Sequence, residues 1–203
     1  RKRIIATIML LLIMTIIAVP SFAHLNSQTG ILEQTYMSHY DGYYIGAERI
    51  GWSIDESMHS YNTITYSINQ YVSQTLKNKI ITAANKWNSV TTISNVASGT
   101  GTVYVGPLLN TVAQVQEQTM DSQGHFTSWK IRISETHKDT ITVANIAHEF
   151  GHVIGLNDLY YSTNSNKLMY GANSGTATQP TTTDIWGARV ILGLHVNHSS
   201  TWP

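Results

Sequence analysis

The most regular pattern of apolar and polar residues in this 203-residue chain begins at Thr63. Apolar side chains alternate with polar ones just after it, at Ile64, Tyr66 and Ile68. A period of two is typical of a strand buried on one face. Ser73 can then cap a helix, because apolar residues follow it every three to four positions, at Leu76, Ile80, Ala84 and Trp87.

Shorter patterns of the same kind follow this helix. Strands are expected around residues 90–93 and 102–105, separated by a spacer that includes the Gly/Ser/Thr run of residues 98–101. A more polar strand is expected near residues 112–120, and the Asp-Ser-Gln-Gly of residues 121–124 favours a turn after it. In the next strand, the apolar residues Trp129, Ile131 and Ile133 alternate with basic ones.

Two further helices are predicted. The first runs from about Thr140 or Thr142 to Gly155 and has an apolar stripe formed by Val143, Ala147, Phe150 and Ile154. The Gly/Ser/Thr-rich residues 172–180 are expected to form a surface loop. Residues 181–184 supply caps and an acidic first turn for a last helix, whose apolar positions are Ile185, Ala188 and Leu192.

The candidate chemistry lies on the first of these two helices. His148 and His152 are four residues apart, so a helix places both imidazoles on one face. Two nitrogen ligands at that spacing can bind one Zn²⁺ at about 2.0–2.1 Å each. Glu149 lies beside this face and can reach a water at the metal without being a ligand. Gly155 lets the chain leave the helix, and Asp158 is the next side chain able to return to the metal.

The stretch His-Glu-Phe-Gly-His-Val-Ile-Gly-Leu-Asn-Asp of residues 148–158, with Met169-Tyr170 after it, resembles the metzincin clan of zinc endopeptidases. It looks most like the matrixin branch. The family has a third histidine where this chain has Asp158, and snapalysin-like secreted bacterial proteases also have an aspartate there. The resemblance implies that Met169 lies beneath the zinc without binding it. It is strong over residues 148–170, looser over about 60–193, and absent from the first 55 or so.

The resemblance also implies the fold. A metzincin is an α+β protein with a mixed, twisted sheet, two long helices above the active-site cleft, and a small C-terminal subdomain that ends in a helix. In that family an edge strand of the sheet pairs with the peptide substrate. The hairpin around residues 121–124 is the candidate for this edge here.

Other residues are less informative. The thermolysin-like zinc pattern needs a later glutamate, and none follows Glu149. Asp184 is interpreted as a helix-start residue, which leaves Asp158 as the third ligand. Tyr170 directly follows Met169, whereas metzincins with a tyrosine ligand place it two residues after the methionine, so Tyr170 is interpreted as structural. His125 and His137 lie where some matrixins hold a structural zinc, but as isolated histidines they are interpreted as surface residues. Calcium binding is left open, because no ligand loop is legible.

The N-terminal segment predicts export. Arg1-Lys2-Arg3 precedes an apolar run over residues 4–19, and Ser21 and Ala23 are small, so a signal peptide over residues 1–23 is expected. Its removal takes away three basic residues from a chain of 12 basic and 12 acidic ones, which leaves a formal charge of −3. That charge is not typical of nucleic-acid binding. Without cysteine the chain has no disulfide.

The expected organisation is a signal peptide (1–23), an N-terminal arm or short pro-segment (24–58) and a metzincin-like catalytic domain (59–203). The expected protein is a secreted zinc endopeptidase that is monomeric, acts on protein or peptide substrates and has no stable membrane association after cleavage of the signal peptide. Two alternatives are a secreted zinc-containing module that binds peptide or glycan without catalysis, and an enzyme that hydrolyses an amide bond of cell-wall peptide. Glu149 argues against the first, because a non-catalytic site has no need of this carboxylate.

Overall fold

The computed structural model describes residues 59–122, 124–172 and 174–193, together with Trp52 and the backbone of two short strands, β1 (Tyr44–Ile45) and β2 (Glu48–Arg49). The predicted signal peptide, and most of the segment 24–58, lie outside the described residues. Within the described part of the chain, no helix has the length and apolar character needed to cross a membrane.

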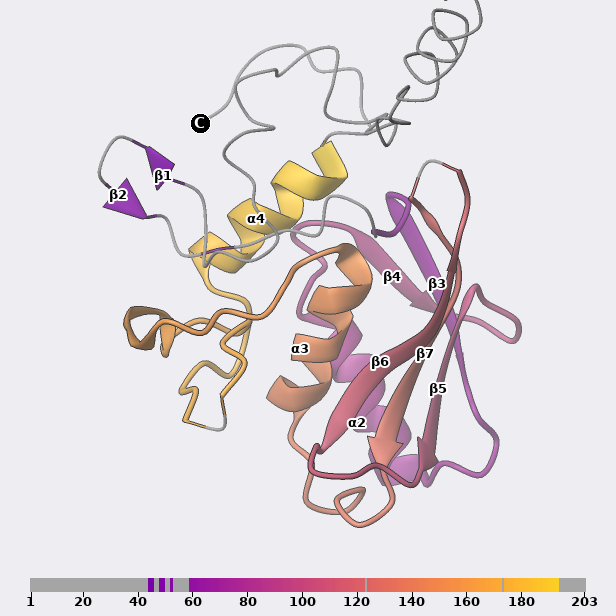
Figure 1. The fold of residues 1–203 in the computed structure, drawn as a ribbon. Coiled ribbons are helices and arrows are strands. Elements are labelled where there is room, and N and C mark those ends of the chain that lie inside the picture. The colour runs from indigo at the N-terminus through magenta and orange to yellow at the C-terminus, as the bar shows by residue number, and fades with distance from the viewer. Residues whose placement is uncertain are drawn as a thin grey trace, which may run out of the picture.

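A mixed sheet of five strands forms the centre of the fold (Figure 1). The strands are β3 (Thr63–Ile68), β4 (Thr92–Asn95), β5 (Gly101–Gly106), β6 (Ala113–Met120) and β7 (Phe126–Ser134). Their order is β4-β3-β5-β7-β6; β4, β3, β5 and β7 are parallel, and β6 is antiparallel to β7. The hairpin that was predicted around residues 121–124 therefore ends the sheet with β6 as an edge strand.

Two helices pack against each other on one face of this sheet (Figure 1). They are α2 (Gln74–Asn85), whose first turn is capped by the Ser73 hydroxyl, and α3 (Val143–Ile154). A third helix, α4 (Thr182–Gly193), lies beyond α3, and a short 3₁₀ turn (Ser162–Asn164) lies in the loop between them. The α+β class and the mixed sheet are thus confirmed.

The expected strand at residues 90–93 is displaced, because the chain forms β4 two residues later. The N–H groups of Val90 and Thr91 both donate to the carbonyl of Trp87, at 2.8 and 3.1 Å. These bonds extend the turn that ends α2, so Val90 and Thr91 are not free to pair with β3. Helix α2 also ends before Trp87, which was the last apolar position of the predicted helix, because Trp87 lies in this turn.

Aromatic side chains join α3 to the sheet. Phe150 is fully buried and makes edge-to-face contacts with Tyr66 of β3 and Trp129 of β7, at centroid distances of 5.2 and 6.2 Å. On the α2 side, the indole N–H of Trp87 donates to the carbonyl of Ala147 at 2.9 Å. The apolar stripe of α3 is therefore fixed against the sheet and α2, and the face with the two histidines points away from them.

Two segments from before β3 also contact the core. Trp52 is buried, and its side chain lies beside Gly187 of α4 and near Leu156. Ser60 bonds to the end of α3, its hydroxyl donating to the carbonyl of Val153 at 2.7 Å.

Candidate metal centre

Helix α3 holds His148 and His152 in a fixed relation. It begins with a capping box, in which the Thr142 hydroxyl accepts from the N–H of Asn145 and the Asn145 side chain accepts from the N–H of Thr142. With both residues on one helix, the two imidazole rings lie at a centroid distance of 4.7 Å and are nearly perpendicular. Neither ring is fully exposed; 16% and 23% of their side-chain surfaces are accessible.

Backbone carbonyls determine which ring nitrogen of each histidine faces the site. Nδ1 of His148 lies 2.8 Å from the carbonyl of Leu168, and Nδ1 of His152 lies 2.8 Å from the carbonyl of Leu156. A carbonyl oxygen can only accept, so each Nδ1 carries the proton and donates it. In the neutral rings this leaves the lone pair on Nε2, which is the nitrogen that faces Asp158.

The chain returns to these histidines through a turn that needs glycine. Gly155 ends α3 with φ of 122°, a conformation that other residues rarely adopt, and its N–H donates to the carbonyls of Gly151 and His152. Leu159 then pairs with a later segment: its N–H donates to the carbonyl of Met169 at 2.8 Å, and its carbonyl accepts from Gly171 at 2.9 Å. Asp158, one residue earlier, is thereby placed opposite the helix.

Asp158 completes a compact group of ligand-type atoms. Its Oδ1 lies 3.0 Å from Nε2 of His148 and 3.6 Å from Nε2 of His152. Among the residues that the structure describes, these three form the group of His, Asp or Glu side chains whose ligand atoms all lie within 4.8 Å of one another. The third ligand predicted from the sequence therefore lies with the other two.

The chemistry of this group fits a divalent zinc ion. Asp158 Oδ1 is buried and faces the Nε2 atoms of both histidines, whereas Oδ2 accepts from the hydroxyl of Tyr160 at 3.1 Å. The carboxylate thus keeps one oxygen for the space between the histidines. Two neutral imidazoles and one carboxylate oxygen are a common set of protein ligands for zinc, and three protein ligands leave a fourth position open.

Without metal, the same atoms form an ion pair. Burial favours neutral His148, but the hydrogen bond to Asp158 and the charges of Glu149 and Asp158 outweigh it and raise the pKa of His148 to about 9. Burial also acts to raise the pKa of Asp158, yet His148 and His152 lower it below its usual value. The site therefore binds a proton tightly when no metal is there.

Glu149 lies beside the three ligand-type side chains without joining them. Its side chain is mostly buried, and its Oε2 accepts from the N–H of Val115 at 3.0 Å. Val115 belongs to β6, and this N–H points away from β7 toward α3. The bond orients the carboxylate from the sheet side and leaves Oε1 available. Sequence reasoning placed Glu149 beside the histidine face but did not identify Val115 as its partner.

Met169 packs directly under the histidine helix. It is buried, and an added Cβ at Gly151 would lie 2.3 Å from its sulfur, so the absence of a side chain at Gly151 allows this contact. Asp184 holds the segment in place: its fully buried carboxylate accepts from the N–H groups of Leu168 and Met169 at 3.0 and 3.2 Å. It also accepts from the Thr181 N–H and hydroxyl, as expected at a helix start. The bonds to residues 168–169 were not predicted.

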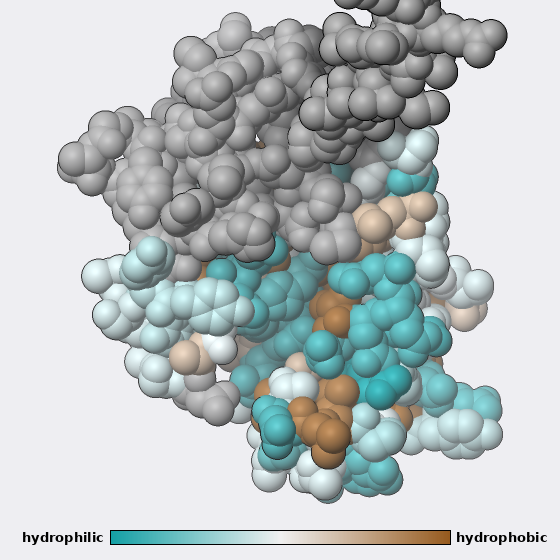
Figure 2. All heavy atoms as spheres, in the orientation of Figure 1, coloured by the Kyte–Doolittle hydropathy of each residue, from teal (hydrophilic) through white to brown (hydrophobic). Residues whose placement is uncertain are grey.

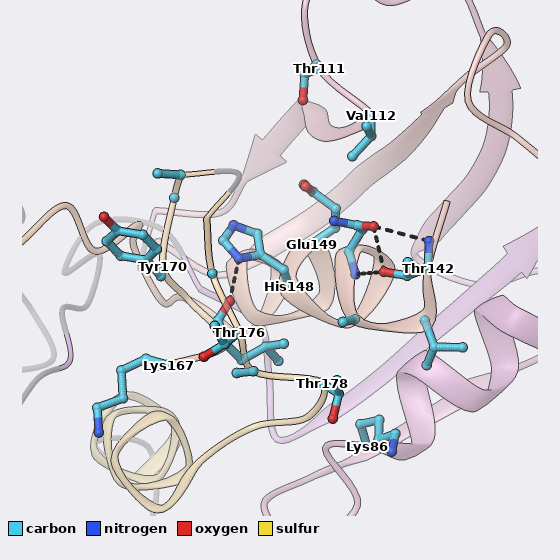
Figure 3. Close-up of a pocket in the computed structure, with 18 of the residues that line it drawn as sticks. Lys86, Thr111, Val112, Thr142, His148, Glu149, Lys167, Tyr170, Thr176 and Thr178 are labelled. Atoms are coloured by element: carbon cyan, nitrogen blue, oxygen red, sulfur yellow. Dashed lines mark hydrogen bonds between the residues drawn. The ribbon is translucent and has the colours of Figure 1, made fainter. Parts of the chain in front are cut away.

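The site lies where two hollows of the surface meet. One, of about 650 Å³, extends toward α2 and the loop of residues 167–178 (Figure 3). The other, of about 500 Å³, extends along β6 and past Asn157. His148 and Glu149 line both, so together they form a groove between β6 and the 156–178 segment. Figure 2 shows a recessed and mostly hydrophilic surface at this place.

The remaining candidate residues lie elsewhere. His125 precedes β7 and is buried, so its interpretation as a surface residue is wrong; it stacks on Tyr61 and contacts Asp121. His137 follows the strand, is exposed as expected and contacts Ser134. The strand between them separates the two histidines by about 30 Å, at roughly 3.3 Å per residue. They therefore cannot share a metal ion. Tyr170 is half-buried and lines the larger hollow.

Comparison with models of known protein families finds none that matches this chain, and comparison with curated proteins likewise finds no match.

Proposed function

We propose that this chain is a secreted, zinc-dependent endopeptidase of the metzincin type. The observation that carries the proposal is the convergence of His148, His152 and Asp158 on one point, with the Glu149 carboxylate beside them in a surface groove. The mixed sheet with two helices on one face and the buried Met169 under the histidine helix are also compatible with it.

His148, His152 and Asp158 would hold the zinc. A zinc ion bound by three such ligands would supply Lewis acidity and would lower the pKa of water to about 7. The chain's own contribution to the metal is orientation: the carbonyls of Leu168 and Leu156 fix the two imidazoles, and Tyr160 fixes the carboxylate.

Glu149 would transfer the proton. As a water oxygen bonds to the peptide carbonyl carbon, Oε1 takes a proton from that water, and it returns the proton to the amide nitrogen as the C–N bond breaks. The N–H of Val115 holds Oε2, so the carboxylate keeps one orientation through both transfers.

An extended peptide would bind along β6. This strand is the edge of the sheet next to the site, and the N–H of Val115 shows that its free side faces the groove. Pairing with an edge strand gives a peptide backbone hydrogen bonds that do not depend on its sequence. Such binding suits an endopeptidase.

The test uses the exported protein, loaded with zinc, and the Glu149→Gln variant. The unmodified protein should cleave a mixed peptide library, lose activity with a chelator and recover it with Zn²⁺. Glu149→Gln should keep one zinc per chain but lose hydrolysis by about 10²–10⁴-fold, the usual contribution of a general acid–base group. His148→Ala should lose both zinc and activity. Zinc binding without cleavage of any peptide would favour the binding-module alternative.

A further inference from the structure

The larger hollow differs from the rest of the groove in its charge. It extends from His148 and Glu149 toward α2, and Lys86 and Lys167 both line it. Both side chains are half-buried, and Figure 3 shows them at opposite ends of the pocket, both away from Val112. Among the described residues that line this pocket, Glu149 is the one carboxylate, and it belongs to the catalytic group.

The charges of these two lysines are not neutralised by the described part of the chain. Neither ammonium group has an ion pair or hydrogen bond there. Two lysines elsewhere do: Lys130 pairs with Glu117, and Lys79 donates to the carbonyls of Asp139 and Ile141. Leaving two half-buried cations unpaired beside a cleft is unfavourable unless water or a ligand solvates them. The pocket is therefore positive in a chain with no net charge.

The start of α3 adds to this potential. Its first turn, residues 142–145, lines the same pocket and has no acidic side chain. The N-terminus of a helix has about half a positive charge from its aligned peptide dipoles. Threonine hydroxyls complete the lining, at Thr82, Thr111, Thr142, Thr176 and Thr178. These groups can donate hydrogen bonds to an anion, and they lie among apolar lining residues that include Val112, Val143 and Leu168.

We propose that this pocket selects a substrate residue with a carboxylate side chain, so that the enzyme cleaves peptide bonds next to glutamate or aspartate. The inference rests on the proposed function, because the pocket opens beside Glu149 and His148 and would receive a side chain adjacent to the reacting bond. Lys86 and Lys167 are the specificity-determining residues, and the ammonium group of one or the other would pair with the carboxylate. The volume of about 650 Å³ is ample for a glutamate side chain and its waters.

The test compares peptides that differ at one position. Cleavage sites in a library are first mapped by mass spectrometry, and peptides with Glu, Gln or Leu at each residue flanking the bond are then compared by kcat/KM. The unmodified enzyme should prefer Glu over Gln by about three- to tenfold on one side of the bond, and salt should reduce this ratio. Lys86→Met and Lys167→Met should each lower the ratio, and Lys167→Glu should favour a lysine peptide instead.

Lys77→Met is the matched control. Lys77 is also a half-buried lysine of α2, but it lies nine residues before Lys86 and does not line the pocket, so its loss should leave the Glu-to-Gln ratio unchanged. A ratio near one, or a ratio that neither pocket lysine changes, would overturn the inference while peptide cleavage still supports the proposed function. If no peptide is cleaved, the affinities of labelled Glu and Gln peptides for the zinc-loaded Glu149→Gln variant are measured by fluorescence anisotropy. Equal affinities would overturn the inference, and tighter binding of the Glu peptide would support it.

Discussion

Gly171 lies against the carboxyl group of Asp158, and adding one methyl group there would test the role of that aspartate. A Cβ at position 171 would be 2.9 Å from both Cγ and Oδ1 of Asp158. Ordinary contacts of a Cβ begin at 3.4 Å, so in Gly171→Ala the carboxyl group must move away by about 0.5 Å (3.4 minus 2.9 Å). The bonds between Leu159 and residues 169–171 prevent the backbone from separating easily.

A displacement of this size is large for a metal ligand. Zinc–ligand distances vary within only about 0.2 Å, and losing the correct orientation of a ligand weakens metal binding by about 10- to 100-fold. Because the three atoms nearest the added methyl group all belong to Asp158, and His148 and His152 lie on α3, two of the three ligands should remain. We therefore expect Gly171→Ala to weaken zinc binding by about 10- to 100-fold, or about 1.4–2.8 kcal/mol.

Zinc affinity is measured by competition between the metal-free protein and a chromophoric chelator at one pH. Gly175→Ala serves as the control, because it lies in the same loop and its added Cβ would meet its nearest atom, the Ala172 carbonyl oxygen, at an ordinary 3.6 Å. Thermal unfolding of both metal-free variants shows whether the fold is intact. Unchanged zinc affinity in Gly171→Ala would refute the idea that Asp158 is a ligand held in place by this contact. An equal loss in both variants would show that the loop, not the carboxylate, is responsible.

Three further predictions concern the same site. Asp184→Ala should lower the free energy of unfolding by about 3 kcal/mol or more, because it leaves several buried N–H donors without an acceptor; urea unfolding measures this, and a change below about 1 kcal/mol would contradict it. In the metal-free protein, the stabilisation from protonated His148 should be fully present below pH 6.5 and be lost as the pH rises through about 9, because the pKa of His148 is raised on folding. The stabilisation from ionised Asp158 should be present above pH 3.8 and be lost below it, because the pKa of Asp158 is lowered on folding. Melting temperatures with a chelator should therefore fall between pH 6.5 and 9, and a flat profile there would argue against the ion pair. Asp158→His, if it folds and binds zinc, should move the acidic limb of the pH–rate profile to lower pH, because a neutral ligand leaves the site more positive and makes its water a stronger acid; a shift to higher pH would reverse this reasoning.

Local patterns predicted the elements that position the site. Alternation from Ile64 to Ile68 indicated β3, and Ser73 was recognised as the cap of α2 because a short hydroxyl side chain there can bind the first free N–H groups. The placement of His148 and His152 on one face and the end of the helix at Gly155 likewise depend on helix geometry alone. Both could therefore be predicted from the sequence. Asp158 was predicted as their partner, and it does lie beside them.

What could not be predicted depends on contacts between distant segments. A period of two indicates that a strand is half-buried, but it does not indicate which strand lies beside it. The order β4-β3-β5-β7-β6 therefore could not be predicted. Asp184 had the features of a helix-start residue, and its bonds to residues 168–169 span 15 to 16 positions that have no regular pattern. The Val115 partner of Glu149 is a backbone N–H, which every residue except proline has, so no side chain could indicate it.

The burial of Trp52 limits how this protein could be matured by proteolysis. An indole in the core, next to Gly187 of α4 and near Leu156, is part of what keeps α4 in position, and removing a buried tryptophan side chain costs about 3–5 kcal/mol. Leu156 lies just after the end of α3, and its carbonyl orients His152. Loss of the Trp52 side chain would therefore alter the packing around Leu156 and, through it, the orientation of His152. A protease that trims the N-terminal segment would therefore have to cut before Trp52 to leave the packing around α4 and the candidate metal site intact.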